Sequence, residues 1–322
     1  SSHIGFFDAL DVVGYNYKEH LYEESHKRFP DKPFLGSENG GGYEQWCAVR
    51  DNAYISGQFL WTGIDYLGEA NWPQRSAGCG CLDTCGFEKD AFYFYKSVWN
   101  QKEKFAYLCP HWNLKLEKGT VLPVICYTNC EDAELFVNGR SFGMKSKGFP
   151  CYGMTERYGH FDRYRRPANT DDLFLSWDVP YEPGKIEVVG YHDGKEVCRY
   201  KVETTGEAAA IKLTVDKTSV DADGRSVVQA EVRIVDSEGH LVFDACPELN
   251  FTLEGDGEII GIDNGDPAFH EQWKETKGRH AFNGMAYVVI RAGQNKGELT
   301  LRVQASGADV AIGKASVTIS QK

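Results

Sequence analysis

The stretch Pro33-Phe-Leu-Gly-Ser-Glu-Asn-Gly-Gly-Gly42 is typical of a short buried strand that carries one carboxylate, Glu38, into a glycine-rich loop. Side chains alternate between the two faces of a strand, so Phe34, Gly36 and Glu38 should share one face. Gly36 leaves room beside Glu38, and residues 40–42, all glycine, let the backbone pass close to a ligand. The pattern predicts that Glu38 is a reacting group at the end of a strand.

Two further apolar strands flank this one, at residues 10–17 and 59–64, and each leads into polar or aromatic residues. Helical patterns separate the strands, which implies parallel pairing. Strand cores with chemistry at their carboxyl ends are typical of a (β/α)8 TIM barrel, but three strands cannot close one. We therefore expect residues 1–103 to be a portion of such a barrel rather than an open three-stranded layer.

Three helices are predicted in this region, at residues 18–28, 44–52 and 88–101. In the last of them Phe92, Tyr95 and Trp99 recur at helical spacing and should form one buried stripe.

The rest of the chain has the alternating pattern of β-sandwiches. Residues 104–206 contain two hairpin signals, Asn138-Gly139 and Asp193-Gly194, between alternating runs. Residues 207–322 contain five more alternating runs with the spacing of an immunoglobulin-like domain. We therefore predict a multidomain α/β plus all-β chain, with two immunoglobulin-like β-sandwiches after the barrel portion.

The charge balance restricts the partners. Lys and Arg total 35 against 47 Asp and Glu, which gives a net charge of −12. This argues against nucleic acid and anionic membranes and is compatible with a neutral sugar. No apolar run is long enough to span a membrane. The ten cysteines leave both their disulfide state and the redox compartment open. Separately, we expect a periplasmic or secreted location rather than a cytoplasmic one.

Several stretches together resemble the last third of glycoside hydrolase family 2 barrels, most closely the bacterial β-galactosidase-like members: residues 33–39, 58–69 and 81–90. Residues 107–113 and 127–139 resemble the immunoglobulin-like domain that follows the barrel in that family. Residues 261–267 and 282–286 resemble its invasin-like C-terminal domain. The resemblance implies that residues 1–103 are the last three βα units of the barrel.

The resemblance also implies a retaining hydrolase of terminal β-galactosides, with an oligosaccharide or glycoconjugate as substrate. Glu38 corresponds to the nucleophile of the double displacement. Trp61 corresponds to part of the sugar platform, although barrel packing is the alternative for this side chain.

Four further residues are substrate-binding candidates by the same resemblance. Asn16 or Tyr17 corresponds to a position beside the nucleophile, where a donor can orient the carboxylate. Asp65 and Glu69 could bind sugar hydroxyls, and loop ion pairs are the alternative for both.

The chain departs from the family in one respect. The acid/base carboxyl of the family lies in an Asn-Glu pair, and no such pair precedes Glu38. We therefore expect this chain to be inactive alone, and an incomplete barrel to self-associate through open edges and apolar surface. The alternatives are a non-catalytic carbohydrate-binding or adhesion fragment and, within the family, a β-glucuronidase or β-mannosidase.

No cofactor is evident, although a structural or activating cation in the complete enzyme remains compatible with the sequence. Cys79, Cys81 and Cys85 suggest soft-metal ligands but lack a second pair at short spacing. The glycines at 40–42 lack the lysine and hydroxyl of a phosphate loop. The basic and aromatic stretch at residues 157–166 is interpreted as a solvated loop rather than a nucleic-acid site.

Overall fold

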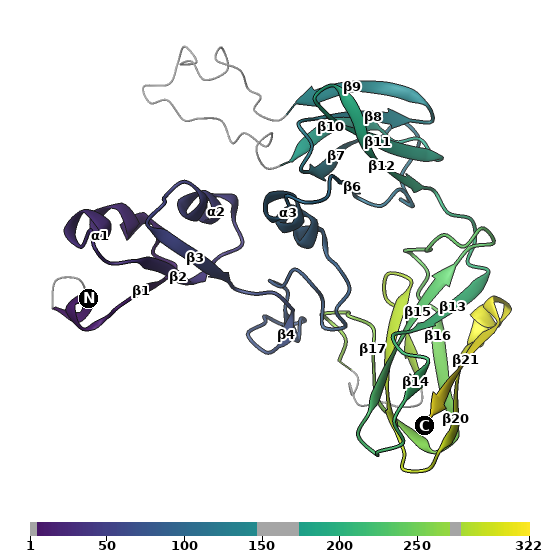
Figure 1. Ribbon diagram of the computed structural model, residues 1–322. Coiled ribbons are helices and arrows are strands. Elements are labelled where there is room, and N and C mark those ends of the chain that lie inside the picture. Colours follow the sequence, from purple (N-terminus) through teal and green to yellow (C-terminus); the bar gives the residue numbers. More distant parts are fainter. Residues whose placement is uncertain (1–4, 147–173, 271–277) are drawn as a thin grey trace. The chain divides into compact units, whose positions relative to one another are not determined.

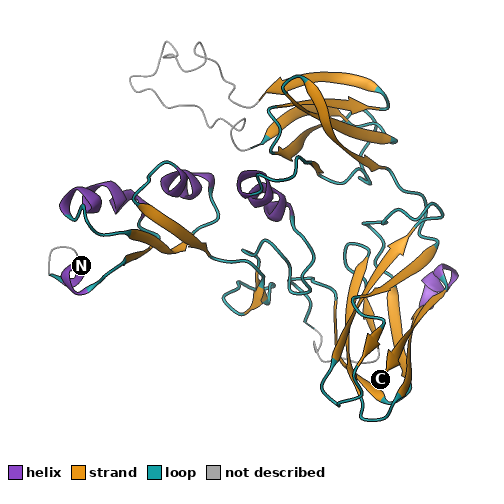
Figure 2. Ribbon diagram, in the orientation of Figure 1, coloured by secondary structure: helices purple, strands orange, loops and turns teal. Residues whose placement is uncertain are grey.

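The protein is described by a computed structural model that covers residues 5–146, 174–270 and 278–322 (Figure 1). It separates into two compact units, residues 1–89 and 90–322. Strands provide most of the regular structure, and the α-helices are short (Figure 2). The stretch at residues 157–166 lies outside the described residues. Within the described part, none of the helices has the length and apolar character needed to cross a bilayer.

The first unit is built on three parallel strands in the order β1-β2-β3. The strands are β1 (Val13–Asn16), β2 (Phe34–Asn39) and β3 (Ile55–Leu60). The connections contain 3₁₀ helices at Phe6–Ala9 and Glu19–Leu21 and the helices α1 (Tyr22–Arg28) and α2 (Tyr43–Arg50). The predicted parallel pairing is confirmed. Within residues 5–89 the three strands form an open sheet, and a barrel is not evident.

Phe34 is central to the core of this sheet. It is fully buried, and it pairs with Val13 on one side and Ile55 on the other. The rings of Phe7 and Tyr15 lie over it, with centroids 6.4 and 6.3 Å away. Apolar packing on these large side chains supplies most of the stability that such a small sheet can gain.

β3 begins earlier than the predicted strand at residues 59–64. Ile55 is 7% exposed and packs into the core, whereas the side chain of Phe59 is 64% exposed. The row of buried side chains across the three strands therefore sets the start of β3. After β3 the chain forms a short antiparallel pair of two-residue strands, β4 (Tyr66–Leu67) and β5 (Ser76–Ala77).

The first sandwich consists of two antiparallel sheets, with strand orders β10-β7-β6 and β12-β11-β8-β9. Its strands are β6 (Ala106–Cys109), β7 (Val121–Thr128), β8 (Asp132–Val137), β9 (Arg140–Ser146), β10 (Leu175–Pro180), β11 (Lys185–His192) and β12 (Lys195–Glu203). Inward side chains of both sheets, such as Val124 and Leu135, form one core around the fully buried Trp112. The predicted hairpin is confirmed: Asn138 and Gly139 have φ of 49° and 80° between β8 and β9.

The second sandwich also has two sheets, with strand orders β13-β15-β19-β17 and β14-β21-β20-β16-β18. Its strands are β13 (Ala210–Val215), β14 (Ser219–Val220), β15 (Val227–Val235), β16 (Glu248–Glu254), β17 (Gly257–Asp263), β18 (Gly278–His280), β19 (Met285–Ala292), β20 (Gly297–Ala305) and β21 (Lys314–Gln321). Alternate residues of both sheets are buried in a shared core, as the alternating sequence predicted.

α3 (Asp90–Trp99) lies in the second unit, whereas the sequence pattern predicts that it belongs to a first domain at residues 1–103. Its Phe94 ring lies 6.2 Å from the ring of Tyr127 on β7. The predicted stripe is wrong at its end, because Trp99 is 50% exposed while Phe94 is buried. Helical spacing indicates that a face is buried, but the sandwich against which it packs determines which face.

Candidate functional site

Glu38 lies near the carboxyl end of β2, beside the end of β1. Asn16 of β1 pairs with Glu38, after a shift in register that follows Tyr15. The backbone N–H of Tyr17 then donates to the Glu38 carbonyl oxygen at 2.8 Å. The two parallel strands thus bring Tyr17 and Glu38 together at the same edge of the sheet.

The Tyr17 hydroxyl lies close enough to the Glu38 carboxylate for the two groups to interact. Desolvation of the hydroxyl, followed by this interaction and the negative charge of Glu38, raises the pKa of Tyr17 to about 12. Of the two positions considered beside Glu38, Tyr17 is therefore the one whose side chain interacts with the carboxylate. The Asn16 side chain instead accepts a hydrogen bond from the Ser37 hydroxyl at 2.7 Å.

We predict that Tyr17 stays protonated far above the ordinary tyrosine range. The tyrosines are labelled with ¹³C at the ring carbon that bears the oxygen and are followed by NMR. The Tyr17 resonance is the one that is lost in Tyr17→Phe, and it should titrate near pH 12. In the matched variant Glu38→Gln the midpoint should fall, because the carboxylate charge that opposes the phenolate is gone. A Tyr17 midpoint near the usual value of about 10 in the unaltered protein contradicts this arrangement.

Asn39 occupies the space beside Gly36 that strict alternation along the strand predicts for Glu38. A Cβ on Gly36 would lie 2.6 Å from Nδ2 of Asn39, so the missing side chain of Gly36 makes room for this amide. Asn39 is fully buried and donates to the Gln58 side chain at 3.0 Å. The register of β2 against β3 shifts between Gly36 and Asn39. An ideal alternation from Phe34 therefore fails at the end of this strand.

Trp61, Tyr66 and Glu69 form a hydrogen-bonded chain after β3. The Trp61 ring nitrogen donates to the Tyr66 hydroxyl at 3.1 Å, and that hydroxyl donates to Glu69 Oε2 at 2.5 Å. Because the Glu69 carboxylate accepts this hydrogen bond, it raises the pKa of the Tyr66 hydroxyl. Trp61 is 40% exposed, so its ring is available at the surface. The backbone N–H of Trp61 donates to the carbonyl oxygen of Asn39 at 2.9 Å, so Trp61 lies at the end of the strand that carries Glu38.

Asp65 is committed to the protein itself. Its carboxylate is buried, pairs with the Lys89 ammonium at 2.9 Å and accepts the Gly80 N–H at 2.7 Å. These contacts match the loop ion pair that was the alternative for Asp65. Two residues of the site were not identified from the sequence, Tyr66 and Lys89. The available signal for Tyr66 was its position five residues after Trp61. The available signal for Lys89 was its positive charge, which can pair with Asp65.

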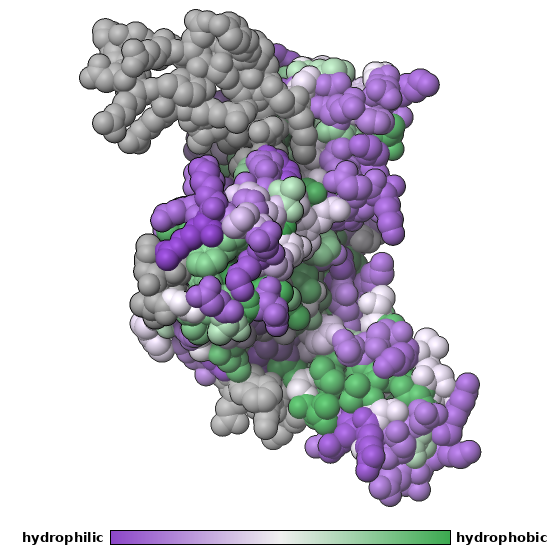
Figure 3. Space-filling model, turned by 60° about the vertical axis from the view of Figure 1, so that its left-hand side comes forward, coloured by the Kyte–Doolittle hydropathy of each residue, from purple (hydrophilic) through white to green (hydrophobic). Residues whose placement is uncertain are grey.

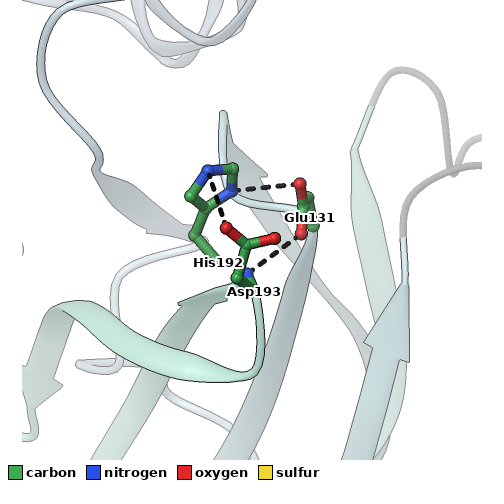
Figure 4. Close-up of side chains that lie close together, drawn as sticks. All are labelled: Glu131, His192 and Asp193. Carbon is green, nitrogen blue, oxygen red and sulfur yellow. Dashed lines mark hydrogen bonds and ion pairs between the residues drawn. The ribbon is translucent and has the colours of Figure 1, made fainter.

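One group of side chains in the described residues has the spacing of potential metal ligands: Glu131, His192 and Asp193 (Figure 4). His192 Nδ1 lies 3.0 Å from Glu131 Oε1, and Nε2 lies 3.9 Å from Asp193 Oδ2. The Asp193 N–H also donates to Glu131 at 3.2 Å. Among the described residues, Cys79, Cys81 and Cys85 form no such group. The contacts of Glu131 tie the β11–β12 turn to the start of β8.

Comparisons with known proteins identify the family of the chain. The sequence model of the glycoside hydrolase family 2 C-terminal domain 5 matches residues 211–312, and a domain of unknown function, DUF4982, matches residues 119–198. The β-galactosidase BoGH2A of Bacteroides ovatus is 33% identical over 98% of this chain. A crystal structure of a glycosyl hydrolase family 2 member from Bacteroides cellulosilyticus covers 98% of the chain with a TM-score of 0.86 and 28% identity. The chain belongs to glycoside hydrolase family 2.

This family 2 chain spans less than half of those relatives: 40% of the Bacteroides ovatus protein and 43% of the Bacteroides cellulosilyticus structure. A putative β-glucuronidase of Formosa agariphila is also similar, with 31% identity over 77% of this chain and 22% of that protein. Family 2 relatives of this chain thus carry two different substrate names.

Proposed function

We propose that this chain supplies the nucleophile of a retaining β-glycosidase, and that the nucleophile is Glu38. The observation that carries the proposal is the pairing at the edge where β1 and β2 end, which sets Tyr17 against Glu38 and lets its hydroxyl interact with the Glu38 carboxylate. Trp61, which is hydrogen-bonded to Tyr66, supplies an exposed aromatic face that is suited to the C–H side of a sugar ring.

In the first step, a Glu38 oxygen bonds to the anomeric carbon while the bond from that carbon to the glycosidic oxygen breaks. The departing oxygen takes a proton from a second carboxyl group, which retaining enzymes hold about 5–5.5 Å from the nucleophile. Water then attacks the same carbon, returns a proton to that carboxyl group and releases Glu38. Tyr17, protonated up to a pH of about 12, keeps the carboxylate in position as a donor.

We further propose that residues 5–89 complete a (β/α)8 barrel whose upstream strands carry the acid/base carboxyl. In support, three parallel strands with intervening helices cannot close a barrel alone. No Asn-Glu pair precedes Glu38, so the chain alone should be inactive. The two sandwiches would be the immunoglobulin-like domains that follow the barrel.

The proposed substrates are terminal β-galactosides. The similarity to a protein named β-galactosidase extends over 98% of the chain. A cation favours a glucuronide carboxylate most strongly, but Lys89 is bound to Asp65, and Glu69 adds negative charge beside Trp61. These charges favour a neutral sugar.

Hydrolysis of two nitrophenyl glycosides tests this choice. The tested protein joins the upstream barrel segment of a relative to the amino end of this chain. We call this protein the complete barrel. We expect kcat/KM for the β-galactoside to exceed that for the β-glucuronide by about 100-fold or more, a difference of about 3 kcal/mol. The reverse preference contradicts the sugar but not the nucleophile. No hydrolysis of any β-glycoside by a folded complete barrel favours the non-catalytic carbohydrate-binding or adhesion fragment.

We also propose that the chain self-associates in the absence of the remaining barrel. Large apolar side chains of the first unit are exposed, including Phe59 at 64%, Leu67 at 54% and Trp72 at 82%. Hydrophobic residues, green in Figure 3, reach the surface between hydrophilic ones. Light scattering after size-exclusion chromatography should give a mass above 36.1 kDa, rising with concentration. A monomer at all concentrations contradicts this expectation.

A further inference from the structure

Two cysteines of the first sandwich, Cys130 and Cys198, lie side by side. Their sulfur atoms are 3.5 Å apart, although the residues are 68 positions apart in the chain. Cys130 is buried just before β8, and Cys198 is half-buried on β12. β8 and β12 do not pair with each other, because β11 lies between them in the sheet.

Gly190 on β11 makes this contact possible. Gly190 pairs with Cys198 on one side and with Ala133 of β8 on the other. A Cβ at this position would lie 2.6 Å from the Cys198 sulfur and 2.7 Å from the Cys130 sulfur, closer than real contacts allow. The two thiols therefore meet over the one residue of the central strand that has no side chain.

We propose that Cys130 and Cys198 form a disulfide when the folded protein meets a small disulfide donor such as oxidised glutathione. The sulfur of Cys198, the more exposed of the two, attacks the donor, whose S–S bond breaks and releases one glutathione thiolate. The sulfur of Cys130 then displaces the second glutathione and bonds to Cys198. Two thiols lose two protons and two electrons, and the donor becomes two molecules of reduced glutathione.

The surroundings define the rate and the effect of this reaction. The hydrogen bond with Cys130 and burial raise the pKa of the Cys198 thiol, so little thiolate is present at neutral pH and oxidation should be slow. To form a bond of about 2.0 Å, the sulfurs must approach by about 1.5 Å, and the backbone on both sides of β11 must accommodate this approach. The bond would link the entry of β8 to β12 and close a long loop, which restricts the unfolded chain.

Peptide mapping without reduction tests the proposal. The folded chain is incubated with oxidised glutathione at mildly alkaline pH, remaining thiols are blocked, and cross-linked peptides are identified by mass spectrometry. We expect a peptide pair joined through Cys130 and Cys198 and an apparent Tm higher by about 5–15 °C than that of the reduced chain. Both effects should be absent in Cys198→Ser.

Cys126 supplies the matched control, because it is a buried thiol close enough to Cys198 to affect the pKa of that thiol. Cys126→Ser should leave the Cys130–Cys198 bond unchanged. Three results overturn the proposal: a Cys126–Cys198 link, mixed glutathione disulfides at Cys130 or Cys198 without a cross-link, or a cross-link that forms only in urea. These outcomes do not depend on Glu38 or on any glycosidase activity.

Discussion

Glu38→Gln in the complete barrel should reduce kcat for an aryl β-galactoside on the order of 10⁴-fold or more, the size typical for loss of a catalytic nucleophile. The amide is nearly the same size as the carboxylate, so the sheet at the end of β2 should keep its structure. It cannot form the glycosyl ester at a useful rate, because a neutral amide is a poor nucleophile. Steady-state kinetics on the purified variant measures this loss.

Two comparisons separate a nucleophile from a structural carboxylate. Glu44→Gln alters an exposed carboxylate in the first turn of α2 and should leave kcat unchanged. In Glu38→Ala, added azide should restore turnover and give the α-glycosyl azide, because azide attacks from the face that Glu38 occupied. A β-glycosyl azide would instead assign Glu38 as the acid/base. Loss of folding in both Glu38→Gln and Glu38→Ala would assign Glu38 a structural role.

Trp112→Ala should cost about 3–5 kcal/mol of unfolding free energy, the largest stability effect that we expect. Trp112 is fully buried in the first sandwich, with its ring 5.2 Å from that of Tyr181. Its ring nitrogen donates to the Glu182 carbonyl at 2.9 Å, and its own carbonyl accepts the Thr204 hydroxyl at 2.9 Å. Truncation therefore leaves a cavity and an unsatisfied acceptor in the core.

Urea unfolding followed by circular dichroism measures this cost. Trp112→Phe keeps most of the packing and loses the donor, so its cost should be smaller, about 1–3 kcal/mol. Leu116→Ala, at a nearby side chain that is 42% exposed, should change stability by about 0.5 kcal/mol or less. A loss for Trp112→Ala no larger than that of Leu116→Ala would show that the buried ring does not stabilise the sandwich.

Short sequence patterns predicted the turn and the strand whose conformation depends on a few neighbouring residues. The Asn138-Gly139 turn formed as expected, because both residues tolerate positive φ. The strand that carries Glu38 was likewise evident, because Phe34 and its apolar neighbours require burial. The ends of elements were less predictable: packing against Phe34 placed the start of β3 at Ile55, which no local pattern specifies.

The site was predictable only in part for the same reason. Tyr17 and Glu38 could be anticipated because the ends of parallel strands meet at one edge. The space beside Gly36 is taken by Asn39, because a change of register turns that amide inward. The link from Trp61 to Glu69 through Tyr66 depends on a short hairpin whose geometry the sequence does not specify.

Covalent trapping tests the central claim most directly. The complete barrel and this chain alone are each incubated with a 2-fluoro-galactosyl donor that has an activated leaving group, then digested and mapped by mass spectrometry. The fluorine slows release of the glycosyl-enzyme, so the nucleophile keeps the sugar. We predict a 2-fluoro-galactosyl ester on Glu38 in the complete barrel and none in the chain alone. A label on a different carboxylate, or none on a folded complete barrel, contradicts the assignment of Glu38.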